Sequence, residues 1–367
     1  MSDPSFPDAA PAPEPLSLGF SGSGAEYFRI WIVNLLLTVA TLGIYSAWAK
    51  TRRLQYFYRN TQLAGASFDF RGNPKAILRG RLLAVVLLAA YHYAFGFSAT
   101  AGAVTVTLLV AALPFMMRSA LRFRLSNTWY RGLPFGFAGG ILPAYRVYAM
   151  PAAMFILPGA LVALLPDQPM ASAVFLLYLG WPLMHGAMKR YQHGNLVYGD
   201  QCASFGACTT ELATPYVITF VAGIVLACIY GGSLYAFFAT HSGEPPSLMA
   251  FGGLVLVYLF FIVGALFVMV RMNNIAWSDT SFPGVRIESA MRLRSWFRLQ
   301  AVNVLLTLLT LGLYRPFAAV RSWRYRLAHV KVEAPDGFDA ATGLAARRAT
   351  TAAGDGSAEF LGLDLSW

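Results

Sequence analysis

Blocks of mostly apolar residues recur along this chain of 367 residues. Each block is about 17 to 25 residues long, the length at which a helix crosses the hydrocarbon core of a membrane. Apolar residues make up 57% of the sequence and charged residues only 12%, about half the charged fraction of soluble domains. The sequence therefore predicts an all-α polytopic membrane protein. Its candidate segments are 28–49, 82–97, 101–117, 147–165, 171–188, 215–239, 248–270 and 302–317.

The six inner segments pair into three hairpins. Their connections at 98–100, 166–170 and 240–247 contain no Lys or Arg, whereas the connections on the other side are basic. Since Lys and Arg are retained on the cytoplasmic side, the pattern predicts six clear transmembrane helices with basic loops in the cytoplasm. The net charge of +11 lies mostly in these loops. We interpret it as a determinant of topology and expect no nucleic-acid binding.

Residues 28–72 resemble residues 297–339. Phe28-Arg29, the run from Asn34 to Thr38 and the run from Thr41 to Tyr45 recur at the same spacing from Phe297 onward, which indicates a duplicated unit. Basic and aromatic residues follow both copies. A single crossing by the second copy would export Arg321 and Arg324 against the charge rule. The sequence therefore predicts two duplicated broken or re-entrant segments, each with both ends inside.

A shorter pattern follows the inward-going segments. An Asn precedes a Phe by eight or ten residues, and in several copies a turn-forming Gly lies between them. Alternating apolar and polar residues around each Phe are typical of a short strand. The pattern predicts small cytoplasmic β-hairpins that pack together, with interfacial loops of similar composition as the alternative. The pairs are Asn60 and Phe68, Asn127 and Phe135, Asn195 and Phe205, and Asn274 and Phe282.

The two ends of the chain differ from the rest. Residues 1–15 are rich in Pro and carry acid but no Lys or Arg, so they lack the basic start of a signal peptide. Residues 335–367 are rich in Ala, Gly and Thr. We expect disordered tails at 1–15 and 335–367, with the membrane domain at 16–334.

The first duplicated segment also carries a family resemblance. Its run from Glu26 to Lys50, followed by Arg52-Arg53 and Tyr56-Phe57-Tyr58, resembles the signature of the YjgN-like family (DUF898). Ala47 stands where the family pattern has proline, and Pro316 restores it in the second copy. The resemblance implies a multi-pass protein of the bacterial inner membrane. It implies no catalytic residues.

No pattern of an enzyme or a metal site emerges from the sequence, and we expect neither catalysis nor a cofactor. Polar side chains inside the duplicated segments are the first candidate site, because an unpaired amide in hydrocarbon is costly. They either hydrogen-bond to neighbouring helices as packing contacts or line a substrate path. These residues are Asn34, Thr38, Thr41, Asn303, Thr307 and Thr310.

Basic residues interleaved with aromatic residues are the second candidate site. This composition suits anionic lipid head groups, and ordinary anchoring at the interface is the alternative. The residues are Arg52, Arg53, Arg59, Arg321, Arg324 and Arg326. Two functions fit the sequence: a permease or channel-like protein for a small solute, and a non-transporting anionic-lipid-binding or scaffold protein. The expected partners are membrane lipids, mainly anionic.

Overall fold

The computed structural model describes residues 15–164, 176–240 and 247–334. Both predicted tails lie outside these residues, apart from Pro15. The helices are α1 (Gly24–Ala40), α2 (Ser46–Arg59), α3 (Pro74–Phe97), α4 (Ala99–Ser126), α5 (Ile141–Leu164), α6 (Trp181–His193), α7 (Thr209–Thr240), α8 (Ser247–Ser278), α9 (Leu293–Leu309) and α10 (Arg315–Ala328). The strands are β1 (Leu16–Ser17), β2 (Gly19–Phe20), β3 (Thr61–Leu63), β4 (Ala66–Phe70), β5 (Thr128–Tyr130), β6 (Leu133–Phe137), β7 (Leu196–Tyr198), β8 (Gln201–Cys202), β9 (Ser204–Phe205), β10 (Thr280–Phe282), β11 (Val285–Ser289) and β12 (Val330–Glu333).

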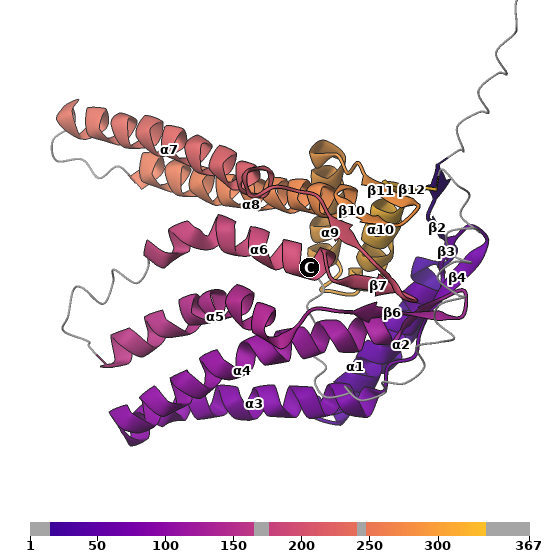
Figure 1. The fold of residues 1–367 in the computed structure, drawn as a ribbon. Coiled ribbons are helices and arrows are strands. Elements are labelled where there is room, and N and C mark those ends of the chain that lie inside the picture. The colour runs from indigo at the N-terminus through magenta and orange to yellow at the C-terminus, as the bar shows by residue number, and fades with distance from the viewer. Residues whose placement is uncertain (1–14, 165–175, 241–246, 335–367) are drawn as a thin grey trace, which may run out of the picture.

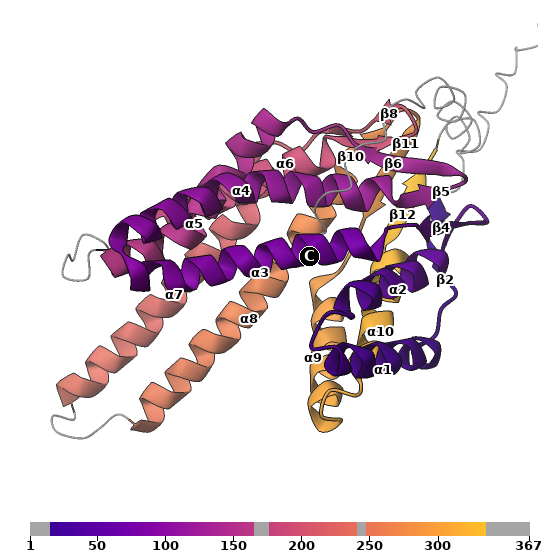
Figure 2. The same cartoon turned by 90° about the horizontal axis from the view of Figure 1, so that it is seen from below.

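The strands gather at one end of the molecule, and helices α3 to α8 run away from them (Figures 1 and 2). Within the described residues, five helices are long and apolar enough to cross a membrane: α3, α4, α5, α7 and α8. The predicted sixth span, 171–188, begins in residues that the structure does not describe, and α6 covers its second part. A polytopic, mostly helical membrane protein is therefore confirmed.

The strands close into a ring. Antiparallel pairing runs without interruption from β2 through β3, β4, β5, β6 and β7 to β8, and from β9 through β10, β11 and β12 to β1. Only Ala203 separates β8 from β9, and only Leu18 separates β1 from β2. Each of these two short stretches therefore joins the two series. Since closure removes the unpaired edges of a sheet, the strands form a small barrel.

Each hairpin of the barrel stands between two helices. In the first, Ala64 and Gly65 have φ of 46° and 73°, and positive φ at both central residues defines the turn that suits a two-residue hairpin. Hairpins occur at all four places marked by the Asn and Phe pattern. The fourth Asn was misassigned, because Asn274 lies inside α8 and Asp279 precedes the strand. The two strands of the fifth hairpin are far apart in the sequence, because β12 at the end of the described chain pairs with β1 at its start.

The helices consequently form five pairs around the barrel: α1 with α2, α3 with α4, α5 with α6, α7 with α8, and α9 with α10. The first and last pairs are the duplicated segments, and the bounds of α1 and α2 correspond residue for residue to those of α9 and α10. These four helices lie beside the strands and do not extend along α7 and α8 (Figures 1 and 2).

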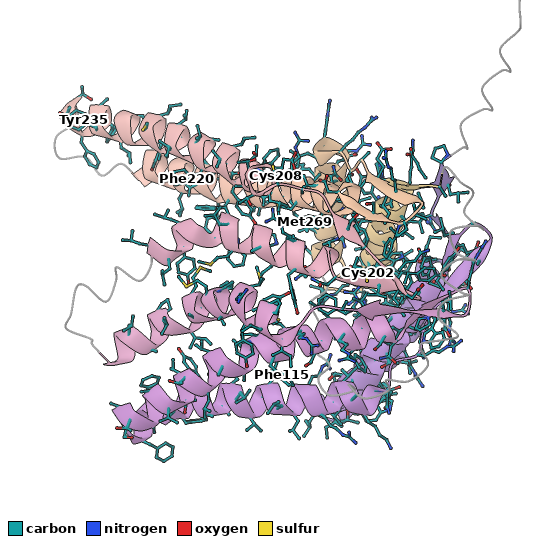
Figure 3. The ribbon with its side chains drawn as sticks, in the orientation of Figure 1. Phe115, Cys202, Cys208, Phe220, Tyr235 and Met269 are labelled. Atoms are coloured by element: carbon teal, nitrogen blue, oxygen red, sulfur yellow. The ribbon has the colours of Figure 1, made fainter. Side chains whose placement is uncertain are left out.

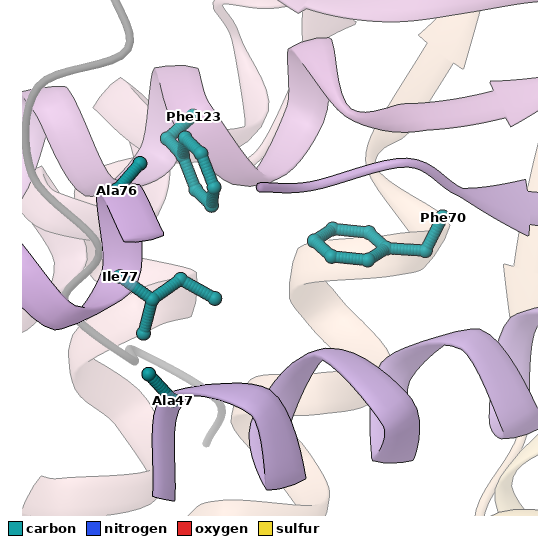
Figure 4. Close-up of a cluster of buried hydrophobic side chains, with 5 residues drawn as sticks. All are labelled: Ala47, Phe70, Ala76, Ile77 and Phe123. Carbon is teal, nitrogen blue, oxygen red and sulfur yellow. The ribbon is translucent and has the colours of Figure 1, made fainter. Parts of the chain in front are cut away.

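A buried cluster attaches the first hairpin to its helices (Figure 4). Phe70 at the end of β4 packs with Ala47 of α2, Ala76 and Ile77 of α3, and Phe123 of α4. Phe70, Ile77 and Ala47 are fully buried. The same cluster therefore fixes the direction in which α2, α3 and α4 leave the barrel.

Closure of the barrel predicts the effect of removing its first strands. Deleting residues 1–20 removes β1 and β2 and leaves the edges of β3 and β12 without partners. Each lost backbone hydrogen bond costs about 1 kcal/mol, so we expect unfolding in detergent at a clearly lower temperature and more aggregation. The measurement is thermal unfolding followed by tryptophan fluorescence. The matched control deletes residues 1–14, and equal unfolding temperatures for the two deletions would contradict closure.

Candidate functional site

A central chamber lies between the barrel and the diverging helices. Its volume is about 1,870 Å³, and its walls come from α4, α5, α6, α7 and α8, with α10 contributing near the strands. Small-molecule sites usually enclose about 300 to 1,000 Å³. The chamber is therefore large for a soluble metabolite.

The barrel core forms the floor of the chamber. In each of the five hairpins, the third residue of the first strand lines this floor. Tyrosine hydroxyls form hydrogen bonds between neighbouring hairpins. Tyr130 donates to the carbonyl of Leu63 at 2.7 Å, and Tyr198 donates to the carbonyl of Tyr130 at 3.1 Å. The five equivalent residues are Leu63, Tyr130, Tyr198, Phe282 and Val332. They pack with other apolar strand residues, so the floor is closed by side chains.

Basic side chains lie just above the floor. Arg124, Lys189 and Arg326 line the chamber from the strand ends of α4, α6 and α10. Each lies within the last five residues of its helix, so all three occupy a similar depth, within about 8 Å of a helix end. Among the described residues, no Asp or Glu lines the chamber. The strand end of the chamber is therefore cationic.

The three basic side chains differ in their contacts. Arg124 Nη2 donates to the hydroxyl of Tyr58 at 3.3 Å. The Arg326 guanidinium lies 5.1 Å from the ring centre of Trp296, and its Nε is buried without a hydrogen-bond partner in the described structure. Burial lowers the pKa of Arg326, but a guanidinium stays charged in proteins. For Lys189, too, the described residues supply no hydrogen bond or ion pair.

His193 is the last residue of α6 and adds polarity without charge. Its Nδ1 lies 2.9 Å from Thr280 Oγ1, which donates to the carbonyl of Ala276. Because that hydroxyl already donates, Nδ1 carries the proton and donates to it. Burial, together with the nearby Lys189, lowers the pKa of His193 to about 3. The ring is therefore neutral at pH 7, and the positive charge of the floor comes from Arg and Lys alone.

The other end of the chamber is apolar and open. Phe155, Phe220 and Phe261 line it and are 62%, 59% and 67% exposed. Figure 3 shows Phe220 on α7 and Met269 on α8, two lining residues at different distances from the strands. Since these helices are candidate membrane spans, their exposed side chains face the hydrocarbon region. At this end the chamber therefore opens between apolar side chains of candidate membrane spans.

The polar residues of the duplicated segments do not line this chamber. Asn34 and Asn303 are buried, and in both the side-chain oxygen has no partner among the described residues. Asn303 Nδ2 donates to Gln300 and Ser322 at 3.1 and 3.2 Å. These contacts connect α9 to α10 and have the character of packing contacts.

The threonines of both segments support the helix break. Thr38 and Thr307 donate to the carbonyls of Asn34 and Asn303, each at 2.6 Å. The hydroxyls of Thr41 and Thr310 accept from the backbone amides four residues later, each at 2.9 Å. Gly43 and Gly312 have φ of 92° and 94°, and the amide of each donates to a Thr carbonyl at 2.7 Å. Both copies therefore use the same turn to reverse the chain.

The predicted head-group arginines have separate surroundings. Arg59 pairs with Asp69 at 2.7 Å, and Arg324 donates to the carbonyl of Gly22 at 2.9 Å, so both support the barrel. Arg52 lies over Tyr45 and Arg53 over Phe57. Arg321 donates to the Tyr314 hydroxyl at 2.8 Å. Of the six, only Arg326 lines the chamber.

Sequence reasoning missed Arg124 and Lys189 as site residues. Both were assigned to the basic flanks that set topology. The signal was their distance from the following strand: Arg124 and Arg326 each stand four residues before it, and Lys189 stands seven before it. Residues at these spacings share one helix face, and here that face lines the chamber.

Comparison with known proteins gives one family and a few relatives. The family model described as a bacterial protein of unknown function (DUF898) matches residues 15–360. The inner membrane protein YjgN of Salmonella typhimurium is 31% identical over 148 residues, which are 38% of this chain and 36% of that protein. YjgN of Escherichia coli K12 is 34% identical over 128 residues, 33% of this chain and 31% of that protein. The matched stretch thus spans about a third of these relatives. No solved structure matches.

The turn in the duplicated segments predicts the effect of two substitutions. Gly43→Ala and Gly312→Ala meet no atom within 4 Å, so their cost is the left-handed backbone alone, about 1 kcal/mol each. We expect each variant to unfold at a lower temperature in detergent, and the double variant at a lower one still. Gly231→Ala is the control, because this helical glycine also has open space but no positive φ. Unchanged stability of the double variant would contradict the role of the turn.

Proposed function

The chain belongs to the DUF898 family of bacterial proteins, whose named relatives here are inner membrane proteins, and we propose that it binds an anionic lipid in its central chamber. The observation that carries the proposal is the lining: apolar walls between candidate membrane spans, and basic residues at the floor with no carboxylate among the described lining residues. The proposal is a binding role and includes no chemical reaction.

The shape of the chamber supports an amphiphile as its occupant. Acyl chains fit the apolar walls, since burying each methylene away from water contributes about 0.8 kcal/mol. The walls lead directly to the hydrocarbon region past Phe155, Phe220 and Phe261. A lipid can therefore reach the chamber from the bilayer without leaving an apolar environment.

The charges of the chamber support an anion. Arg124, Lys189 and Arg326 bring positive charge into a partly buried site. Burial is costly for Lys189 and Arg326, which have no ion pair within the described structure. An anionic head group at the floor would offset this cost while its chains extend toward the membrane. Surface arginines such as Arg52 and Arg321 would contact further head groups at the interface.

A small-solute permease is less well supported. Its predicted path depended on Asn34, Asn303 and the nearby threonines, and none of them lines the chamber. Lipid binding uses the chamber as it stands.

We also propose that the barrel faces the cytoplasm. Many basic residues lie in the turns of the barrel or in the helices that lead into its strands, as do Arg52, Arg59 and Arg131. Charges of this sign beside membrane spans are retained on the cytoplasmic side. The floor of the chamber would then lie level with the inner leaflet, where anionic lipids are available.

Filling the chamber should displace lipid. Ala227→Trp with Ala265→Trp adds two indoles to the lining, and we expect the variant to retain at most about half as many lipids per chain as the wild type, because a filled volume excludes acyl chains. Native mass spectrometry of protein released from nanodiscs counts the bound lipids.

The control for chamber filling is Ala236→Trp with Ala239→Trp. These residues lie on α7 near its end, are exposed and do not line the chamber. This variant should retain lipid like the wild type. Equal lipid counts for all three proteins would show that the chamber holds no lipid.

Native cysteines can test the orientation. Cys202 and Cys208 are free and exposed near the strands, whereas Tyr235 lies at the far end of α7 (Figure 3). In a Cys228→Ser background, a membrane-impermeant maleimide should label neither native cysteine in intact spheroplasts but should label both after permeabilisation. Tyr235→Cys should be labelled in intact spheroplasts. The opposite pattern would place the barrel outside.

A further inference from the structure

We infer that the bound lipid carries a phosphate monoester, held at the floor of the chamber by Arg326, Lys189 and Arg124. The inference rests on the proposed lipid binding and adds the chemical class of the head group. It follows from how many cations share the floor and from how few groups are available to neutralise them.

The three cations come from three different helix pairs but share one depth. Arg124 and Arg326 occupy the same place relative to β5 and β12, and Lys189 stands about one turn earlier on the corresponding face of α6. All three line the same chamber. The strand ends of the helices therefore surround the floor with positive charge.

Three carboxylates at this end of the molecule have partners of their own. Asp69 accepts from Arg59 and Arg71 at 2.7 and 3.1 Å. Glu26 caps α1 by accepting from the amide of Ser23 at 3.2 Å, and Glu211 accepts from the amide of Cys208 at 2.9 Å. None of these carboxylates is among the residues that line the chamber. Within the described chain, no carboxylate lines the chamber beside Arg326 and Lys189.

Arg326 points most directly to a ligand. Trp296 lies on one face of the guanidinium, and its Nε is a buried donor without an acceptor in the described structure. Leaving a buried donor unsatisfied costs about 1 to 3 kcal/mol, and more when the group is charged. Phosphate oxygens accept from the planar guanidinium in a well-matched geometry.

The number of cations favours a monoester over a diester. A phosphate monoester carries about −1.5 to −2 charges at pH 7 and presents three free oxygens. A phosphodiester carries one charge and presents two free oxygens. With weak screening in an apolar chamber, each further negative charge on the ligand strengthens its attraction to the cations. Gln192 lines the same chamber and donates one amide N–H to Tyr148, so its second N–H can donate to a remaining oxygen.

The test compares lipids that differ only in their head groups. Nanodiscs are prepared with equal amounts of phosphatidic acid, phosphatidylglycerol and diacylglycerol that carry distinguishable but equivalent acyl chains, and native mass spectrometry of the full chain records which lipids remain bound. We expect phosphatidic acid to be retained at least about tenfold over phosphatidylglycerol, with diacylglycerol retained least. A separate sample contains inorganic phosphate at millimolar concentration.

Two variants on one helix connect the preference to the chamber. Arg326→Gln removes a lining charge, whereas Arg315→Gln removes an exposed charge of the same helix that does not line the chamber. Arg326→Gln and Lys189→Gln should each reduce the preference for phosphatidic acid at least about fivefold, and Arg315→Gln should leave it unchanged. Arg326→Lys should keep part of the preference. Unfolding temperatures identify any variant that fails to fold, and the Lys189 variant tests the inference independently of the Arg326 variants.

The outcomes separate the inference from the proposed function. Retention of phosphatidylglycerol at the level of phosphatidic acid, with less diacylglycerol, would overturn the inference and leave anionic-lipid binding intact. Retention of diacylglycerol at that same level would overturn both. Absence of every lipid from the wild type would overturn both. Displacement of phosphatidic acid by inorganic phosphate alone would show that the floor takes soluble phosphate and that acyl chains add nothing.

Discussion

Closure of the strand ring is the constraint on which the remainder of this structure depends. Strands of two to five residues are too short to be stable as isolated hairpins. Each hairpin gains both neighbours only when the ring closes, and closure requires the first strand of the chain to meet the last. This brings the two duplicated segments together, so that Tyr27 of α1 packs against Val320 of α10 beside Phe57 of α2.

The ring also determines where space remains between the helices. Helices leave its circumference in five pairs and diverge, but the first and last pairs are adjacent in the ring and turn back early at Gly43 and Gly312. Above the level of the strands, the chamber walls therefore come from α4, α5, α6, α7 and α8. The chamber therefore results from the arrangement of three long helix pairs and two short helix pairs around the closed ring of strands.

Local patterns predicted much of this fold, because they depend on local physics. Apolar block length located the five helices of the described chain that are long and apolar enough to cross a membrane. The repeat from Thr41 to Tyr45 correctly marked where both helices break. The hairpins followed from turn chemistry and alternation. Ring closure could not be predicted in this way, since the pairing of Leu16 with Val332 joins strands of two and four residues across the entire chain. Asn34 and Asn303 were predicted as site residues because an unpaired amide inside a membrane is costly. The structure places them between helices, away from the chamber.

Arg326 shows why the basic residues of a membrane protein need to be distinguished by their surroundings. Positive charges that set topology act by staying in water or among head groups, and long side chains can reach that environment from a helix end. Arg59 fits this description, because it is 59% exposed and paired with Asp69. Arg326 does not, because its Nε is buried and unpaired within the described structure and its side chain lines the chamber. Topology alone gives no reason to bury a charge there, whereas an anionic ligand at the floor does.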